Sequence, residues 1–240
     1  MKKFLGVLLS LWASKIFSLL RNGDKKRWGR SEIAQMQFSF SQFGEDIIVA
    51  KYLENFDPSD GIYVDVGAFD PTTFSNTLLL HKKGWQGINI DIDPDKINEF
   101  IRLRPSDFNQ VAAVSDRSEK LKFACYPARA TNQLFSLDST DCISILGEEP
   151  TQVIVLETTR LDKILQASPF SGKNIYYLNI DCEGHDFNVL KSFDIDYYSP
   201  KVISIETWLD EDLKNIENYL LPRGYTLSAY VHPTRIFTKL

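Results

Sequence analysis

The chain has 240 residues, of which 43% are hydrophobic and 25% are charged, and its formal net charge is −5 at pH 7. This composition suits one globular α/β domain with a sizeable core and excludes wholesale disorder. The acidic balance argues against a general nucleic-acid binder, which would usually carry a basic excess. The three cysteines are widely spaced, so they indicate neither a disulfide framework nor a zinc finger and favour a reducing, cytoplasmic compartment.

Residues 1–21 begin with a basic pair and continue through an apolar run that Lys15 interrupts. Apolar side chains recur at helical spacing opposite a polar face, which predicts an amphipathic helix. Its role stays open between peripheral membrane contact, packing on the domain or on a second copy, and a signal or anchor. Residues 22–37 are polar and are expected to form a linker, so the folded domain is predicted over residues 38–240.

From residue 38 onwards, apolar segments of strand and helix character alternate. In chain order the predicted elements are helix 47–53, strand 62–66, helix 73–83, strand 87–92, helix 95–103, strand 110–114, helix 160–166, strand 175–180, strand 201–205, helix 211–221 and a hairpin of 225–231 with 235–239. Residues 120–159 break this pattern with short apolar runs, as in a hairpin or an insertion on the substrate side. The order predicts an α/β fold with a mostly parallel central sheet, helices on both faces and a C-terminal antiparallel hairpin.

The first predicted strand, 62–66, ends in the segment Asp65-Val66-Gly67-Ala68. Open parallel sheets bind ligands at the carboxyl ends of their strands. A glycine there allows a tight turn and a close approach of backbone to ligand, and a carboxylate can accept hydrogen bonds from a ligand ammonium group. Asp91 ends the second strand, where an acidic residue suits ribose hydroxyls. These residues predict a nucleoside-binding turn.

No glycine-rich dinucleotide fingerprint follows this turn, because Gly67 is followed by Ala68-Phe69-Asp70-Pro71. The three-glycine loop that cradles a pyrophosphate is therefore missing, which argues against NAD or FAD. S-adenosylmethionine has no pyrophosphate and needs no such loop. The segment alone does not exclude an ordinary α/β turn with an incidental aspartate.

Four stretches of the chain resemble the FkbM-type family of class I S-adenosylmethionine methyltransferases. They are residues 41–46, residues 64–68 with Pro71 and 75–77, residues 84–91 with Pro94, and residues 178–186 with Val189 and Leu190. The resemblance implies a Rossmann-like class I methyltransferase fold and S-adenosylmethionine as the cofactor. It also implies that Asp65, Gly67 and Ala68 form the turn at the methionine side of the cofactor, and that Asp91 holds the ribose.

The resemblance implies four further cofactor residues. Ser75 and Asn76 are expected at the start of the first helix, close to the cofactor or the acceptor. Ser115 and Asp116 follow the third strand and are expected near the adenine.

Asp181, Glu183 and His185 follow the fourth core strand and are the predicted catalytic residues. In the family that the chain resembles, this strand end faces the transferable methyl group. Transfer requires an aligned nucleophile, and a hydroxyl acceptor must also lose a proton. His185 or Asp181 is the candidate general base, and Glu183 the group that orients the histidine or binds an acceptor hydroxyl. A turn residue at Asp181 and a structural histidine at 185 remain open.

The acidic cluster raises the question of a metal, since Asp, Glu and His at alternate positions are able to ligate a divalent ion. The expectation from the sequence is nevertheless a site without metal. In the middle insertion, polar and aromatic side chains suit a sugar-like or polyol acceptor, although ordinary loop polarity explains them equally: Tyr126, Arg129, Asn132 and Gln133.

Together these observations predict an S-adenosylmethionine-dependent methyltransferase that O-methylates a hydroxyl of a saccharide or secondary metabolite. The expected partner is a small-molecule or saccharide acceptor and not nucleic acid. The expected location is the cytoplasm, with membrane contact through residues 1–21 and homo-oligomerisation left open. One alternative is a non-catalytic cofactor-binding or scaffold module of a membrane-associated assembly. A second, disfavoured by the missing glycine fingerprint, is a dinucleotide-dependent oxidoreductase.

Overall fold

The computed structural model describes residues 30–127, 131–140, 142–143 and 147–240. The chain divides after Phe38 into two units, residues 1–38 and 39–240. Of the first unit, the described part holds the short helix α2 (Arg30–Ala34), which falls inside the predicted linker. The amphipathic helix expected over residues 1–21 lies outside the described residues, as does Arg129. In the part that is described, no helix combines the length and the apolar character needed to cross a bilayer.

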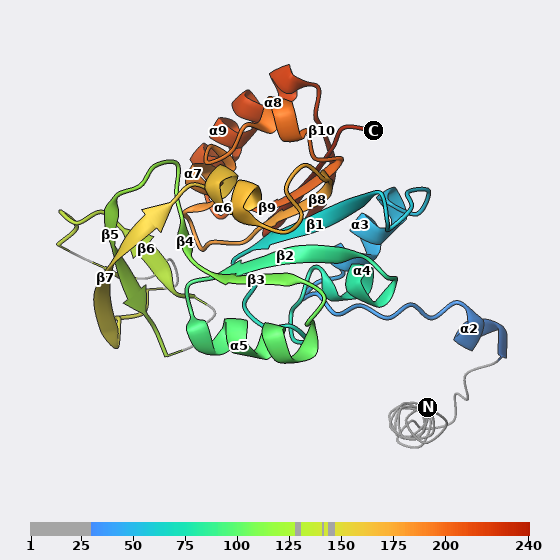
Figure 1. The fold of residues 1–240 in the computed structure, drawn as a ribbon, viewed down its shortest axis with the longest axis horizontal. Helices are drawn as coiled ribbons and strands as arrows, with labels where there is room; N and C mark the ends of the chain where they lie inside the picture. The colour runs from blue at the N-terminus through green and yellow to red at the C-terminus, as the bar shows by residue number, and fades with distance from the viewer. Residues whose placement is uncertain (1–29, 128–130, 141, 144–146) are drawn as a thin grey trace. The chain divides into compact units, whose positions relative to one another are not determined.

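Residues 39–240 form an α/β unit around a mixed sheet of seven strands (Figure 1). In spatial order these are β10 (Thr226–Val231), β11 (Thr234–Thr238), β9 (Val202–Glu206), β8 (Asn174–Ile180), β1 (Gly61–Val66), β2 (Gln86–Asp91) and β3 (Phe108–Val111). The five strands from β9 to β3 run parallel, whereas β11 is antiparallel to both of its neighbours. The predicted C-terminal hairpin is thus β10 and β11.

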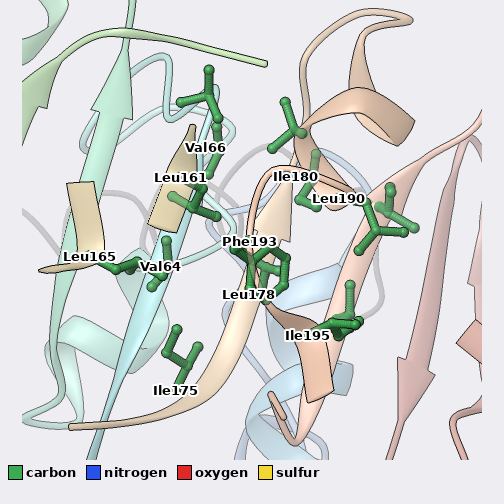
Figure 2. Packing of buried hydrophobic residues seen from close by; sticks show 14 of the residues in the cluster. Val64, Val66, Leu161, Leu165, Ile175, Leu178, Ile180, Leu190, Phe193 and Ile195 are labelled. Carbon is green, nitrogen blue, oxygen red and sulfur yellow. The ribbon is translucent and has the colours of Figure 1, made fainter. Parts of the chain in front are cut away.

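Helices cover both faces of this sheet, because its central strands are apolar on both sides. They are α3 (Glu45–Tyr52), α4 (Leu78–Lys82), α5 (Pro94–Leu103), α6 (Leu161–Ala167), α7 (Asp186–Leu190), α8 (Ile195–Tyr198) and α9 (Asp210–Leu220), which a 3-10 turn, η1 (Leu221–Arg223), extends. On β1, Val64 and Val66 face one cluster, to which α6, α7, α8 and α9 contribute. Tyr63 faces the opposite cluster with α3 and α4. Figure 2 shows the first cluster, where Leu161, Leu178 and Phe193 meet.

The segment that interrupts the predicted alternation forms a second, four-stranded sheet. Its strands, in order, are β4 (Ala113–Val114), β7 (Gln152–Thr159), β5 (Lys120–Cys125) and β6 (Gln133–Phe135). The strand predicted over 110–114 is divided at Ala112, whose backbone N–H donates to the Asp91 carbonyl, so that β3 stays in the main sheet and β4 pairs with β7. This second sheet lies beside the carboxyl ends of β2 and β3 (Figure 1).

Candidate functional site

A cavity of about 470 Å³ lies at the carboxyl ends of β1, β2, β8 and β9. Pockets of this size accept small molecules and cofactors. Its walls include the residues at or just after these strand ends: Gly67, Ala68, Phe69, Asp91, Ile92, Asp93, Asp181, Cys182, Glu183, Glu206 and Trp208. Other segments contribute further lining residues: Gln42, Phe43 and Glu45; Phe74 and Asn76; Lys96; Ala112 and Val114; Phe123, Thr131, Asn132 and Leu134; and His232, Pro233 and Thr234.

Gly67 makes the turn after β1 possible. Its φ is +78°, and a Cβ built on it would lie 1.7 Å from the carbonyl oxygen of Asp181. The N–H groups of Gly67 and Ala68 both donate to the carbonyl of Ile90, at 3.0 Å, and the N–H of Asp181 donates to the carbonyl of Val66. A glycine is therefore required because three strand ends converge here, and the same turn opens the cavity to a ligand.

Asp65 lines the cavity, but the protein itself engages both of its carboxylate oxygens. Asn179 donates to Oδ1 at 2.8 Å and Thr77 donates to Oδ2 at 2.7 Å. Burial raises the pKa of Asp65, while these two hydrogen bonds lower it. Each carboxylate oxygen has two lone pairs, so a ligand could still add a bond. The direct role visible in the structure is to fix β1 against β8 and the segment that precedes α4.

Asp91 lines the cavity from the end of β2, the strand next to β1. The backbone N–H groups of Phe69 and Asp93 each donate to one of its oxygens, at 2.9 Å. Burial raises the pKa of Asp91 to about 6, and these two backbone donors act against that rise. The carboxylate is thereby held in one orientation at the cavity wall, where it is able to accept hydrogen bonds from hydroxyl groups.

Ser75 and Asn76 take different places, although they are neighbours in sequence. Ser75 does not line the cavity; its hydroxyl accepts a hydrogen bond from buried Arg104 at 2.8 Å and from the N–H of Leu78. Asn76 lines the cavity, is 8% exposed, and donates through Nδ2 to Asn179. Its Oδ1 is buried and has no hydrogen-bond partner, which is costly without a ligand donor.

Asp181 and Glu183 reach the cavity and meet a third carboxylate, Glu206, at the end of β9. Oxygen atoms of the three lie within 4.8 Å of one another. Burial raises the pKa of Glu183 to about 7, with Asp186 adding to the rise. Burial also raises the pKa of Asp181 and of Glu206 well above the ordinary carboxyl range, and the neighbouring carboxylates increase the effect.

The structure does not bring His185, Ser115 and Asp116 to the cavity. His185 begins α7, and its Nε2 lies 2.9 Å from the hydroxyl of Ser115. Burial lowers the pKa of His185 to about 4, so the imidazole is neutral near pH 7. Asp116 pairs with Lys191 at 3.1 Å. These contacts connect the segment after β4 to α7 and the residues that flank it.

Of the described residues predicted to suit an acceptor in the insertion, one lines the cavity and two do not. Asn132 lines the cavity, and its Oδ1 accepts from the N–H of Tyr126. The Tyr126 hydroxyl is directed to the carbonyl of Cys142, and both Tyr126 and Gln133 are buried without lining the cavity.

Glu206, Asn179 and Arg104 were not among the predicted site residues. A signal for Glu206 is present: three parallel strands end in a polar, apolar, acidic triplet, namely Asn89-Ile90-Asp91, Asn179-Ile180-Asp181 and Ser204-Ile205-Glu206. Their register aligns these triplets side by side with Asp65-Val66-Gly67 of β1. Since side chains alternate with period two, the acidic members must gather at one edge. No comparable pattern marks Arg104, whose partners are distant in sequence.

Comparisons with known proteins add one match. A family model described as the methyltransferase FkbM domain matches residues 65–227, which is more than half of the chain. The matched region contains the cavity residues Asp65, Asp91, Asp181, Glu183 and Glu206. No curated protein and no solved structure matches the chain.

Proposed function

Because the chain belongs to the FkbM methyltransferase family, we propose that it is an S-adenosylmethionine-dependent O-methyltransferase with a Rossmann-like class I fold. The acceptor we propose is a hydroxyl group of a saccharide or secondary metabolite. The observation that carries the proposal is one cavity lined by two chemically different groups, an oriented Asp91 on one side of β1 and a buried carboxyl cluster on the other.

The position of the cavity supports a nucleoside cofactor. The neighbours of β1 are β2 on one side and β8 on the other, so the strand order changes direction at β1. Open α/β sheets bind ligands at such a switch point, outside the carboxyl ends of the strands. Asp91 would accept hydrogen bonds from the ribose hydroxyls. Asn76 Oδ1, which lacks a donor, suits the ammonium group of the methionine portion.

The carboxyl cluster supports the acceptor end. Bound S-adenosylmethionine supplies an electrophilic methyl carbon, so the protein has to align a nucleophile and receive its proton. Asp181 and Glu183 are the proposed residues, since both line the cavity. A carboxyl whose pKa is about 7 matches a general base that works near neutral pH. His185, directed to Ser115, would act by supporting the loop between β8 and α7.

Titration calorimetry tests the cofactor. We expect S-adenosylmethionine to bind and NAD to give no heat of binding. Asp91→Asn should weaken the cofactor affinity about tenfold or more, because a charge-assisted hydrogen bond is worth about 1.5–3 kcal/mol. Asp95→Asn is the matched control, since Asp95 is exposed in the first turn of α5 and does not line the cavity. Selective binding of NAD would contradict the proposal, and equal affinities of the two variants would remove Asp91 from the ribose role.

Mass spectrometry then tests transfer to a hydroxyl. Monosaccharide and catechol acceptors are incubated with the protein and the cofactor, and the products are examined for an added methyl group on oxygen. A protein that binds the cofactor and methylates nitrogen or carbon acceptors instead would retain the cofactor assignment and lose the O-methylation.

A further inference from the structure

Asp181, Glu183 and Glu206 gather at one place in the cavity wall, and no Lys or Arg among the described residues forms an ion pair with them. None of the ion pairs found in the described part of the chain includes Asp181, Glu183 or Glu206. Burial is the largest cause of the raised pKa values of these three residues, and neighbouring carboxylates are the next largest. Three negative charges in a low-dielectric site are unfavourable unless they are protonated or balanced by a cation.

A second observation, independent of the clustering, points to a ligand. Glu206 is 8% exposed and lines the cavity, yet its Oε2 has no partner at hydrogen-bond geometry, although the indole of Trp208, whose Nε1 is also unpaired, is close enough to lower the pKa of the carboxyl. Glu183 Oε2 is also buried without a partner. Buried carboxylate oxygens without donors are rare in folded proteins, because each loses its hydration without compensation. Both orphaned oxygens belong to side chains that face the same space.

The distances in the cluster suit a hard divalent cation. Two oxygens bound to one ion lie at most twice the ion–oxygen distance apart, about 4.6–5.2 Å for Ca²⁺ and about 4.2 Å for Mg²⁺. The three carboxylate oxygens lie within 4.8 Å of one another. They therefore meet the limit for Ca²⁺ as they stand, and a small closing of the side chains would admit Mg²⁺ or Mn²⁺. The remaining ligand positions would be filled by water or by acceptor oxygens.

From these contacts we infer that Asp181, Glu183 and Glu206 form a binding site for one divalent cation with oxygen ligands. These three ligands differ from the Asp181, Glu183 and His185 that the sequence offers as a metal-binding alternative. His185 lies against Ser115, and Glu206 is the third carboxylate of the cluster. In the proposed reaction, the ion would lower the pKa of a coordinated acceptor hydroxyl. That role rests on the proposed function, whereas cation binding does not.

Calorimetry with the full chain tests this site. The protein is treated with a chelator and titrated with CaCl₂, MgCl₂ or MnCl₂ in the absence of S-adenosylmethionine. We expect one site for at least one of these ions.

Glu206→Gln keeps the shape of the side chain and should weaken the affinity roughly tenfold or more. Glu211→Gln is the matched control, since it removes the same charge from an exposed position on α9 and should bind like the wild type. If circular dichroism shows that Glu206→Gln is unfolded, Glu183→Gln replaces it.

The outcomes separate this proposal from the proposed function. No binding of any of the three ions, or wild-type affinity in the glutamine variants of the cluster, overturns the cation site. Cofactor affinity measured on the same samples decides the other question. Cation binding without S-adenosylmethionine binding would overturn the function and leave the site, and the reverse result would leave the function alone.

Discussion

At the residue scale, polar groups on the sheet surface determine how the cavity is built. Ser204, Asn179, Asp65 and Asn89 occupy neighbouring register positions on β9, β8, β1 and β2. Hydrogen bonds connect Ser204 to Asn179 and Asn179 to Asp65. Ser204, Asn179 and Asp65 each have hydrogen-bond partners in this network, so their burial is favourable. The network therefore fixes the register in which the strands end. The same register sets the positions of Asp181 and Glu206, two residues after Asn179 and Ser204.

Gly67 offers a test of how tightly those strand ends converge. We expect Gly67→Ala to lower the free energy of unfolding in two ways, through strain at positive φ and through the clash with the Asp181 carbonyl. Gly84→Ala is the control, because Gly84 has a φ of +96° and nothing within 4 Å of its added Cβ. The control should cost about 1 kcal/mol, and Gly67→Ala about 1–3 kcal/mol more.

Urea unfolding of the two variants measures the difference. Equal losses of unfolding free energy would mean that β1 and β8 do not meet as closely as the structure has them.

At the scale of elements, the connection from β1 to α4 is held by α5 and the residue after it. Arg104 directly follows α5, is 1% exposed, and donates to Thr77, to Ser75 and to the carbonyl of Pro71. The same connection contains Phe74 at a φ of +54°, outside the helical region. For this reason the helix predicted over 73–83 begins only at Leu78.

Arg104→Met should therefore destabilise the protein by about 3–5 kcal/mol, because it leaves buried partners without their donor beside the Asp65 carboxylate. It should also weaken cofactor affinity, since Asn76 lies in the released connection. Arg102→Met is the control on the same helix; its exposed ion pair with Glu99 is worth less than about 1 kcal/mol.

Thermal and urea unfolding provide the comparison. A variant pair with similar unfolding midpoints would show that Arg104 does not hold this connection together.

At the scale of the whole molecule, both hydrophobic clusters lie within residues 39–240. A chain that begins at Ser39 should keep the unfolding free energy of the full chain within about 0.5 kcal/mol, as for changes outside a core. It should also keep the cofactor affinity, because every residue that lines the cavity is retained.

Denaturant unfolding and calorimetry on the two chains test this expectation, and liposome sedimentation of the same pair tests membrane contact of residues 1–21. A shortened chain that unfolds at a clearly lower denaturant concentration would show that residues 1–38 contribute to the stability of the domain.

Local sequence was sufficient for the elements that are long and apolar. Each core strand was predicted to within a residue or two at its ends, except for 110–114, which the hydrogen bond from Ala112 to Asp91 divides. The two short helices α7 and α8 were missed, since five and four residues give too few turns for a periodic pattern. The α/β class and the FkbM methyltransferase family were both predicted before the fold was known.

Tertiary structure decided which of the predicted site residues meet. Asp91, Asp181 and Glu183 come together in one cavity because parallel strands end at the same edge of the sheet. The orientation of a side chain after the strand is not set by its position in sequence. His185 therefore lies against Ser115 and Ser75 against Arg104, while Glu206 joins the site from the end of β9. Sequence alone determined the strand ends and their acidic residues, and packing between distant segments determined which of them share the cavity.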